Sequence, residues 1–178
     1  MAFNKAKFKE LVLYFAKQGE NDMYMGSVKL NKLLFYADFL AYGYLGHSIT
    51  GARYIHLPQG PGPSELLPVR NEMEKEGKLR QEKVYRLNHF QWRPVALDAP
   101  NISLFSKEEL DICQDAIRLL QNCPAEEISD RSHNWLGWIY ADTKETIPYE
   151  TVFIRSREPI TFSDIAWAKQ NMPQQGQA

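Results

Sequence analysis

Cysteine is scarce in this chain, which contains only Cys113 and Cys123 among 178 residues. The two lie ten positions apart in a helical pattern, which fits neither a C-x-x-C pair nor a disulfide framework. Apolar runs are short, and none reaches the roughly 18 residues that a membrane-spanning helix requires. The sequence therefore argues against disulfide-stapled and membrane-spanning proteins. It favours two buried, reduced thiols in a cytoplasmic protein.

An excess of either charge is also missing, since 21 Lys and Arg residues face 22 Asp and Glu residues. A net charge of −1 argues against a broad surface for nucleic acid or anionic membranes, although a local basic patch is compatible with it. The helices expected at 4–18 and 27–46 could imitate a helix-turn-helix. Their connection of about eight residues is longer than the usual three to four, and the second helix is too apolar for a DNA groove. We therefore expect no nucleic-acid binding.

The hydrophobic share of 44% and the length predict one globular domain over residues 1–172, followed by a flexible polar tail at 173–178. Apolar periodicity predicts an α+β, mainly α fold: a compact helical domain around a central helix with a small antiparallel β-sheet. Expected helices cover 4–18, 27–46, 64–77, 107–122 and 124–132, with a last one from Thr161. Expected strands cover 52–57, 79–87 and 90–97, the last two forming a hairpin.

Asn4, Ser27 and Ser106 are the expected N-caps, and Gly46 is the expected stop of the second helix. The first residues, with Lys and Glu inside their apolar run, predict a helix rather than a signal peptide.

The helix expected at 27–46 has more apolar surface than one buried face needs. One apolar stripe consists of Leu30, Leu33, Leu34, Ala37, Leu40, Ala41 and Tyr44, and a second of Phe35, Phe39 and Tyr42. Lys29, Lys32 and Asp38 interrupt this surface, and buried charges are rare unless they are paired. Either the helix is central and its charges are paired internally, or one edge reaches solvent or a partner. Aromatic residues on such an edge would supply much of the binding energy.

The segment 58–63, PQGPGP, cannot sustain a helix or a central strand because it contains three prolines and two glycines. It is expected to be a shaped loop. One interpretation is a rigid connection between a strand and a helix. The other is a pre-organised recognition loop, because prolines reduce the entropy lost on binding and glycines allow close approach of another backbone.

Asp130 and His133 form an Asp-x-x-His pair, which could supply two metal ligands or a general base with its orienting group. A metal-dependent hydrolase would need a further ligand, and no HExxH or CxxC partner is present. The favoured interpretation is a capped helix start, with His133 packed on Trp135 or Trp138. We therefore expect no metal, no cofactor and no catalytic residue, and we interpret the pair as structural support for a binding face.

Together these segments resemble the Panacea domain, or SocA-like antitoxin domain, of bacteria and phages. The matching pieces, in the order of that family, are KLNKLLFYADF at 29–39, ITGARY at 49–54, QGPGP at 59–63, LFSKEEL at 104–110, SDRSHNWLGW at 129–138 and IPYE at 147–150. They span most of the chain. The resemblance implies a compact helical domain with a small sheet that acts as the antitoxin of a two-gene toxin–antitoxin module and is not an enzyme.

The resemblance also implies a partner, a cognate protein toxin encoded in the same operon, whose active or substrate-binding surface is blocked by direct contact. One relative instead delivers its toxin to an AAA+ protease, so a proteolytic adaptor is an alternative. Some members carry an N-terminal DNA-binding segment. This chain begins almost directly with the domain, and we do not expect self-repression through such a segment. The expected contact residues are Lys29, Lys32, Phe35, Tyr36, Phe39, Gln59, Pro61, Pro63, Asp130 and His133.

Overall fold

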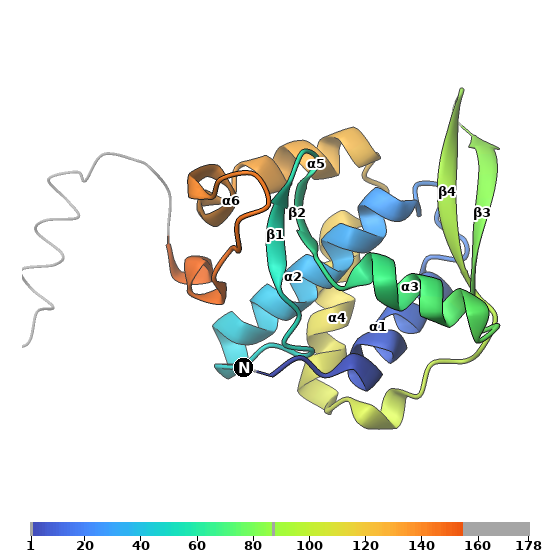
Figure 1. Ribbon diagram of the computed structural model, residues 1–178, viewed down its shortest axis with the longest axis horizontal. Helices are drawn as coiled ribbons and strands as arrows, with labels where there is room; N and C mark the ends of the chain where they lie inside the picture. Colours follow the sequence, from blue (N-terminus) through green and yellow to red (C-terminus); the bar gives the residue numbers. More distant parts are fainter. Residues whose placement is uncertain (1, 87, 155–178) are drawn as a thin grey trace, which may run out of the picture.

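The computed structural model describes residues 2–86 and 88–154, and it confirms an α+β, mainly helical fold (Figure 1). The elements are α1 (Lys5–Gln18), α2 (Ser27–Leu45), β1 (Tyr54–Leu57), β2 (Gly60–Pro63), α3 (Leu66–Lys75), β3 (Leu79–Arg86), β4 (His89–Ala96), η1 (Ile102–Leu104), α4 (Lys107–Leu120), α5 (Ala125–His133), α6 (Leu136–Tyr140) and η2 (Tyr149–Phe153). No helix within the described ranges is long and apolar enough to cross a membrane. The helix expected from Thr161 and the tail at 173–178 lie outside the described residues.

Most helix ends lie where local sequence signals predict them. The side chain of Asn4 caps α1 by accepting a hydrogen bond from the backbone N–H of Lys7 (3.0 Å). The capping box that begins at Ser106 forms at the start of α4. Gly46 ends α2 with a φ of 77°, a left-handed conformation that glycine adopts without strain.

The expected N-cap of α2 is wrong by one residue. Gly26 takes the cap position, which leaves this end of the helix without a side-chain cap. The hydroxyl of Ser27 instead donates a hydrogen bond to the backbone carbonyl oxygen of Trp92 (3.2 Å). The serine therefore ties α2 to β4 instead of closing its own helix.

The segment 58–63, expected to be a loop, contains strand β2, and this correction changes what its prolines do. β2 pairs with β1 in antiparallel register, with Tyr54 opposite Pro63 and Leu57 opposite Gly60. Proline is tolerated because this sheet has two strands, so one edge of β2 needs no backbone N–H. Pro58 and the residue after it form an exposed turn, whereas β2 is buried. The segment 58–63 therefore consists of an exposed two-residue turn followed by the buried strand β2.

The predicted second hairpin is confirmed and projects from the helical body (Figure 1). At its base Leu79 is buried. Along β4, the buried Arg93 donates hydrogen bonds to the backbone carbonyl oxygens of Gly19 (2.8 Å), Glu20 (2.5 Å) and Asp22 (2.8 Å). These bonds attach the hairpin to the loop between α1 and α2.

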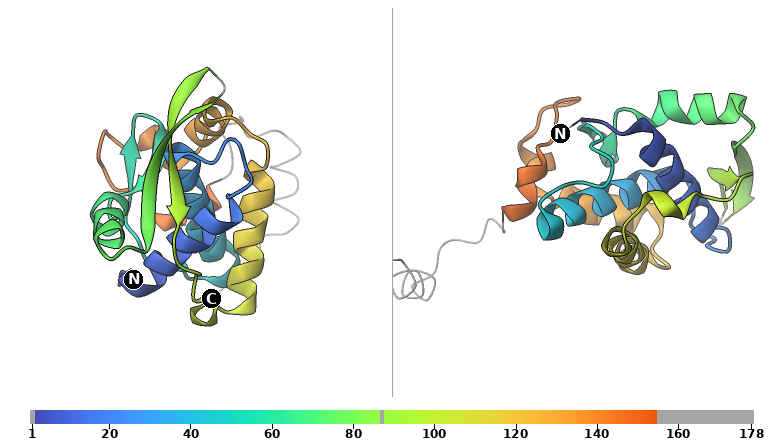
Figure 2. Two further views of the ribbon diagram at one scale, coloured as in Figure 1. Left: turned by 90° about the vertical axis from the view of Figure 1, so that its right-hand side faces the viewer. Right: turned by 90° about the horizontal axis from the view of Figure 1, so that it is seen from below.

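Helix α2 is the centre of the fold (Figure 2). Phe35 and Phe39 of its second apolar stripe are buried, whereas Tyr42 is partly exposed. Phe35 packs edge-on against Trp135, with ring centroids 5.2 Å apart, and Phe39 packs on Tyr149 at 4.7 Å. Residues 135–153 of the same chain therefore cover the surplus apolar surface. Tyr44, expected in the first stripe, is 75% exposed. Both cysteines are free and buried, as predicted.

Candidate partner-binding site

Two of the three charged side chains on α2 find polar partners inside the fold. Lys29, only 2% exposed, forms an ion pair with Asp22, with 2.5 Å between Nζ and Oδ2. The carboxylate of Asp38 accepts hydrogen bonds from the backbone N–H and hydroxyl of Thr50 (2.8 and 2.5 Å) and from the hydroxyl of Tyr54 (2.7 Å). Complete burial raises the pKa of Asp38 to about 6 despite these bonds. Internal pairing, one of the two alternatives, therefore accounts for Lys29, whereas hydrogen bonds from neutral groups satisfy Asp38.

Lys32 is the third charge and has no acidic partner. Its side chain is 1% exposed, and its ammonium group donates a hydrogen bond to the backbone carbonyl oxygen of Pro61 (2.8 Å). It takes part in none of the ion pairs found among the described residues. Burial lowers the pKa of Lys32 to about 7, because the charged form is poorly solvated there. This lysine joins α2 to β2.

A cavity of about 360 Å³ lies beside this contact, between the first turns of α2 and the β1–β2 turn. We call it the turn cavity, and its lining consists of Val28, Asn31, Lys32, Leu57, Pro58, Gln59, Gly60 and Pro61. The amide of Asn31 is held by a hydrogen bond to the carbonyl oxygen of Ser27 (2.8 Å), whereas Gln59 is exposed at the rim. A largely apolar recess with a polar rim suits a side chain of a partner protein.

Two glycines of β2 bring this strand unusually close to the neighbouring helices. A Cβ atom on Gly60 would lie 2.2 Å from Oγ of Ser132 and 2.8 Å from Nζ of Lys32. A Cβ atom on Gly62 would lie 2.8 Å from Oδ1 of Asn31. Gly60 also has a φ of 89°, which only glycine adopts readily. The strand, and with it the exposed turn, is therefore held in one position relative to α2 and α5.

Helix α5 packs beside β2, but its Asp-x-x-His pair is not a shared site. Asp130 is exposed to solvent. The imidazole of His133 stacks on Trp138, with ring centroids 4.2 Å apart, and Trp138 also stacks on His56 at 4.2 Å. The indole N–H of Trp138 donates to the carbonyl oxygen of Leu57 (3.1 Å). The prediction that His133 packs on a tryptophan is confirmed, and the stack ties α6 to β1. The expected capped helix start is wrong, because Asp130 and His133 lie in the last turn of α5.

The geometry gives the hydrolase alternative no third ligand. Within the described ranges, no group of three or more His, Cys, Asp or Glu side chains could hold a metal ion. Nε2 of His133 is buried and has no hydrogen-bond partner there. A general base must reach the proton that it abstracts, which a ring stacked in this way does not do.

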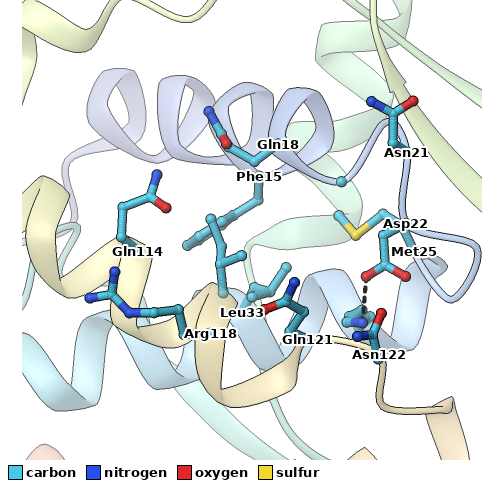
Figure 3. Close-up of a pocket in the computed structure, with 13 residues that line it drawn as sticks. Phe15, Gln18, Asn21, Asp22, Met25, Leu33, Gln114, Arg118, Gln121 and Asn122 are labelled. Atoms are coloured by element: carbon cyan, nitrogen blue, oxygen red, sulfur yellow. Dashed lines mark hydrogen bonds and ion pairs between the residues drawn. The ribbon is translucent and has the colours of Figure 1, made fainter.

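A second cavity, of about 380 Å³, lies on another face of α2 (Figure 3). We call it the amide cavity, because the carboxamides of Gln18, Asn21, Gln114, Gln121 and Asn122 stand around it. Phe15, Met25 and Leu33 supply its apolar wall, and the ion pair of Lys29 with Asp22 lies at one end. Lys29 therefore faces a different cavity from Lys32.

The ten predicted contact residues are thus distributed over several places. Lys32, Gln59 and Pro61 surround the turn cavity. Asp130 and His133 lie on α5, which packs beside β2. Lys29 lies at the amide cavity with Asp22. The other four side chains are buried, namely Phe35, Tyr36 and Phe39 in the core and Pro63 opposite Tyr54, so a partner that docks on the folded domain does not reach them directly.

Sequence reasoning did not identify several residues of this region. Val28, Asn31 and Leu57 line the turn cavity, and Ser132 contacts β2 at Gly60. A glycine in a proline-rich segment indicates that a neighbouring group lies close to the backbone at that position. The sequence does not reveal which side chain that is, because the approaching groups belong to other elements.

Comparison with known proteins gives one match. The family described as "Antitoxin SocA-like, Panacea domain" matches residues 30–139, a range that contains the turn cavity apart from Val28 and extends over both hairpins, α4 and α5. No curated protein and no solved structure matches the chain.

Proposed function

Since the chain belongs to the antitoxin SocA-like, Panacea-domain family, we propose that it neutralises a cognate protein toxin by binding to it. The family suggests a non-enzymatic role. Steric cover of the toxin's active or substrate-binding surface needs no chemistry from the antitoxin. The proposed partner is a toxin encoded beside this chain in the same operon, in a cytoplasmic module.

The observation that supports this proposal most is the fixed β1–β2 turn beside the turn cavity. Pro58 and Gln59 are exposed, while the strand behind them is held by Lys32 and by close contacts at its glycines. A binding surface that is already ordered loses little conformational entropy when a partner docks. We propose that Gln59, the edge of Pro61 and the exposed Asp130 contact the toxin, and that the buried residues below them position the turn.

Co-expression with the neighbouring open reading frame tests the proposal. We expect that frame to arrest growth alone, that this chain restores growth, and that the two proteins co-purify. Gln59→Arg places a long cation at the exposed turn, and it should abolish rescue without unfolding the domain. Gln18→Arg, on the exposed end of α1, is the matched control and should rescue normally. Rescue without a complex would contradict direct binding.

The proteolytic adaptor is separated from steric block by toxin abundance. Steric neutralisation leaves the amount of toxin unchanged while its activity disappears. An adaptor for an AAA+ protease would instead lower the amount of toxin, and this fall would disappear in a strain that lacks the protease. Quantitative immunoblots of the toxin during rescue provide the measurement.

A further inference from the structure

The projecting hairpin has an aromatic face. In the β3–β4 register, Lys83 lies opposite Trp92 and Tyr85 opposite Phe90, which places all four side chains on one face of the sheet. The three aromatic side chains are 53–63% exposed. The ammonium group of Lys83 lies 4.6 Å from the ring centroid of Phe90. Adjacent exposed aromatic side chains are uncommon on a protein that has no partner.

This face borders two cavities that lie between the hairpin and α3. A cavity of about 270 Å³ is lined by Ser27, Arg70, Glu74, Gln81 and Trp92. A neighbouring cavity of about 440 Å³ shares Glu74, Gln81 and Trp92 with it. The two cavities thus lie side by side along the hairpin, and together we call them the hairpin groove.

Two buried hydrogen-bond donors in the hairpin groove have no acceptor. Nε of Arg70 and Nε2 of Gln81 are both buried and unpartnered within the described residues. The hydroxyl of Ser27 shares its one proton between the carbonyl oxygen of Trp92 (3.2 Å) and Oε1 of Gln81 (3.5 Å), and the amide nitrogen of Gln81 stays without a partner among the described residues. A buried donor without an acceptor costs free energy, and native structures contain few of them. Two such donors in one groove indicate a ligand that brings acceptor oxygens.

The charge of Arg70 indicates which acceptor fits. Arg70 belongs to none of the ion pairs found in the described part of the chain, although Glu74 follows it by one helical turn. At the end of the hairpin, Arg86 likewise belongs to none of these ion pairs, and the ammonium group of Lys83 lies over the ring of Phe90. A planar guanidinium binds a carboxylate through two parallel hydrogen bonds.

We propose that the hairpin groove binds a segment of the toxin that carries an acidic side chain beside an apolar one. The carboxylate accepts hydrogen bonds from Arg70 and Gln81, and the apolar side chain packs on the exposed ring of Trp92. This inference rests on the proposed function and adds the chemistry of the partner. Nucleic acid is a poorer match, because the chain has a net charge of −1 and no excess of basic residues.

One partner can reach both this groove and the turn cavity. The hydroxyl of Ser27 is bonded to the carbonyl oxygen of Trp92 at the groove, and the next residue, Val28, lines the turn cavity. The first turn of α2 therefore separates the two recesses. A toxin that covers this turn contacts the hairpin on one side and Gln59 on the other.

The test measures binding of the purified toxin from the neighbouring gene by calorimetry. Arg70→Met and Trp92→Ser should each raise Kd at least tenfold. Arg53→Met and Tyr44→Ser, which alter exposed residues of the same types elsewhere, should change Kd less than twofold. Arg70→Met should keep the melting temperature of the free chain, because it removes an unpaired buried donor. Arg70→Glu should lose binding and regain it when one acidic toxin residue is changed to Arg.

The possible failures are distinguishable. If the wild-type chain neither binds nor neutralises the toxin, the proposed function and this inference are both overturned. If the wild type binds and both groove variants bind within twofold of it, only the groove assignment is overturned. It is also overturned if the variants change the oligomeric state of the free chain, or if a single-stranded oligonucleotide binds the groove in competition with the toxin.

Discussion

The ammonium group of Lys32 donates a hydrogen bond to the backbone carbonyl oxygen of Pro61, with 2.8 Å between the two atoms. This buried contact joins the central helix α2 to the proline-rich strand β2. Pro61 belongs to the strand directly behind the exposed turn, so the contact helps to hold the proposed binding surface. It also places a titratable group where water cannot solvate its charge.

Lys32→Met should change how stability depends on pH. Burial lowers the pKa of Lys32 from 10.5 to about 7, so the unfolded chain binds more protons than the folded chain between these values. The free energy of unfolding of the wild type should therefore rise with pH over this range. Relative to Lys32→Met, the rise should be on the order of 2–3 kcal/mol between pH 7 and pH 9.5. Urea denaturation at both pH values measures it, and parallel changes in the two proteins would refute the prediction.

Asp38→Asn should remove a pH dependence of stability that has the opposite sign and lies at acidic pH. The pKa of Asp38 is raised from 3.8 to about 6, so the folded chain binds more protons than the unfolded chain in this window. The wild type should lose about 2–3 kcal/mol of stability as the pH rises from 4 to 7, and the variant should not show this loss. Denaturation curves at pH 4 and pH 7 test it. A stability difference that stays constant between the two proteins would rule it out.

Gly60→Ala should destabilise the fold more than Gly77→Ala. Both positions have a positive φ, of 89° and 71°, so each variant incurs backbone strain. An added Cβ meets no atom within 4 Å at Gly77, whereas at Gly60 it overlaps Ser132 and Lys32. The difference in the free energy of unfolding should be about 1–3 kcal/mol. Equal losses would show that β2 moves away from the helices without cost.

Asp130→Ala and Trp138→Ala should distinguish a residue that contacts the toxin from a residue that stabilises the fold. Asp130 is exposed, so its removal should change stability by less than about 0.5 kcal/mol, and weaker toxin binding would then report a lost contact. Trp138 is stacked on two imidazoles and hydrogen-bonded to Leu57, so its removal should cost about 2–4 kcal/mol. Thermal melting and calorimetry on the same samples provide both readouts. Unchanged binding by Asp130→Ala would remove this residue from the interface.

Features that depend on neighbours in the sequence could be predicted well. The cap at Asn4, the capping box at Ser106, the stop at Gly46 and the long hairpin are present as expected. The strand at 60–63 was missed because proline argues against strands in general, and only pairing with β1 shows that the free edge tolerates it. The hairpin groove was missed as well, since Arg70 and Gln81 have no shared pattern in the sequence.

The sequence by itself established that α2 needs cover on more than one side, because apolar periodicity reports the faces of a single element. It also established the family, through short segments in a fixed order. Only the tertiary structure decided what covers the second stripe and how the charges are satisfied. These contacts join distant positions, such as the hydroxyl of Tyr42 and the carboxylate of Glu150, which are 108 residues apart. Periodicity carries no information on such pairs, because their proximity arises only when several elements pack together.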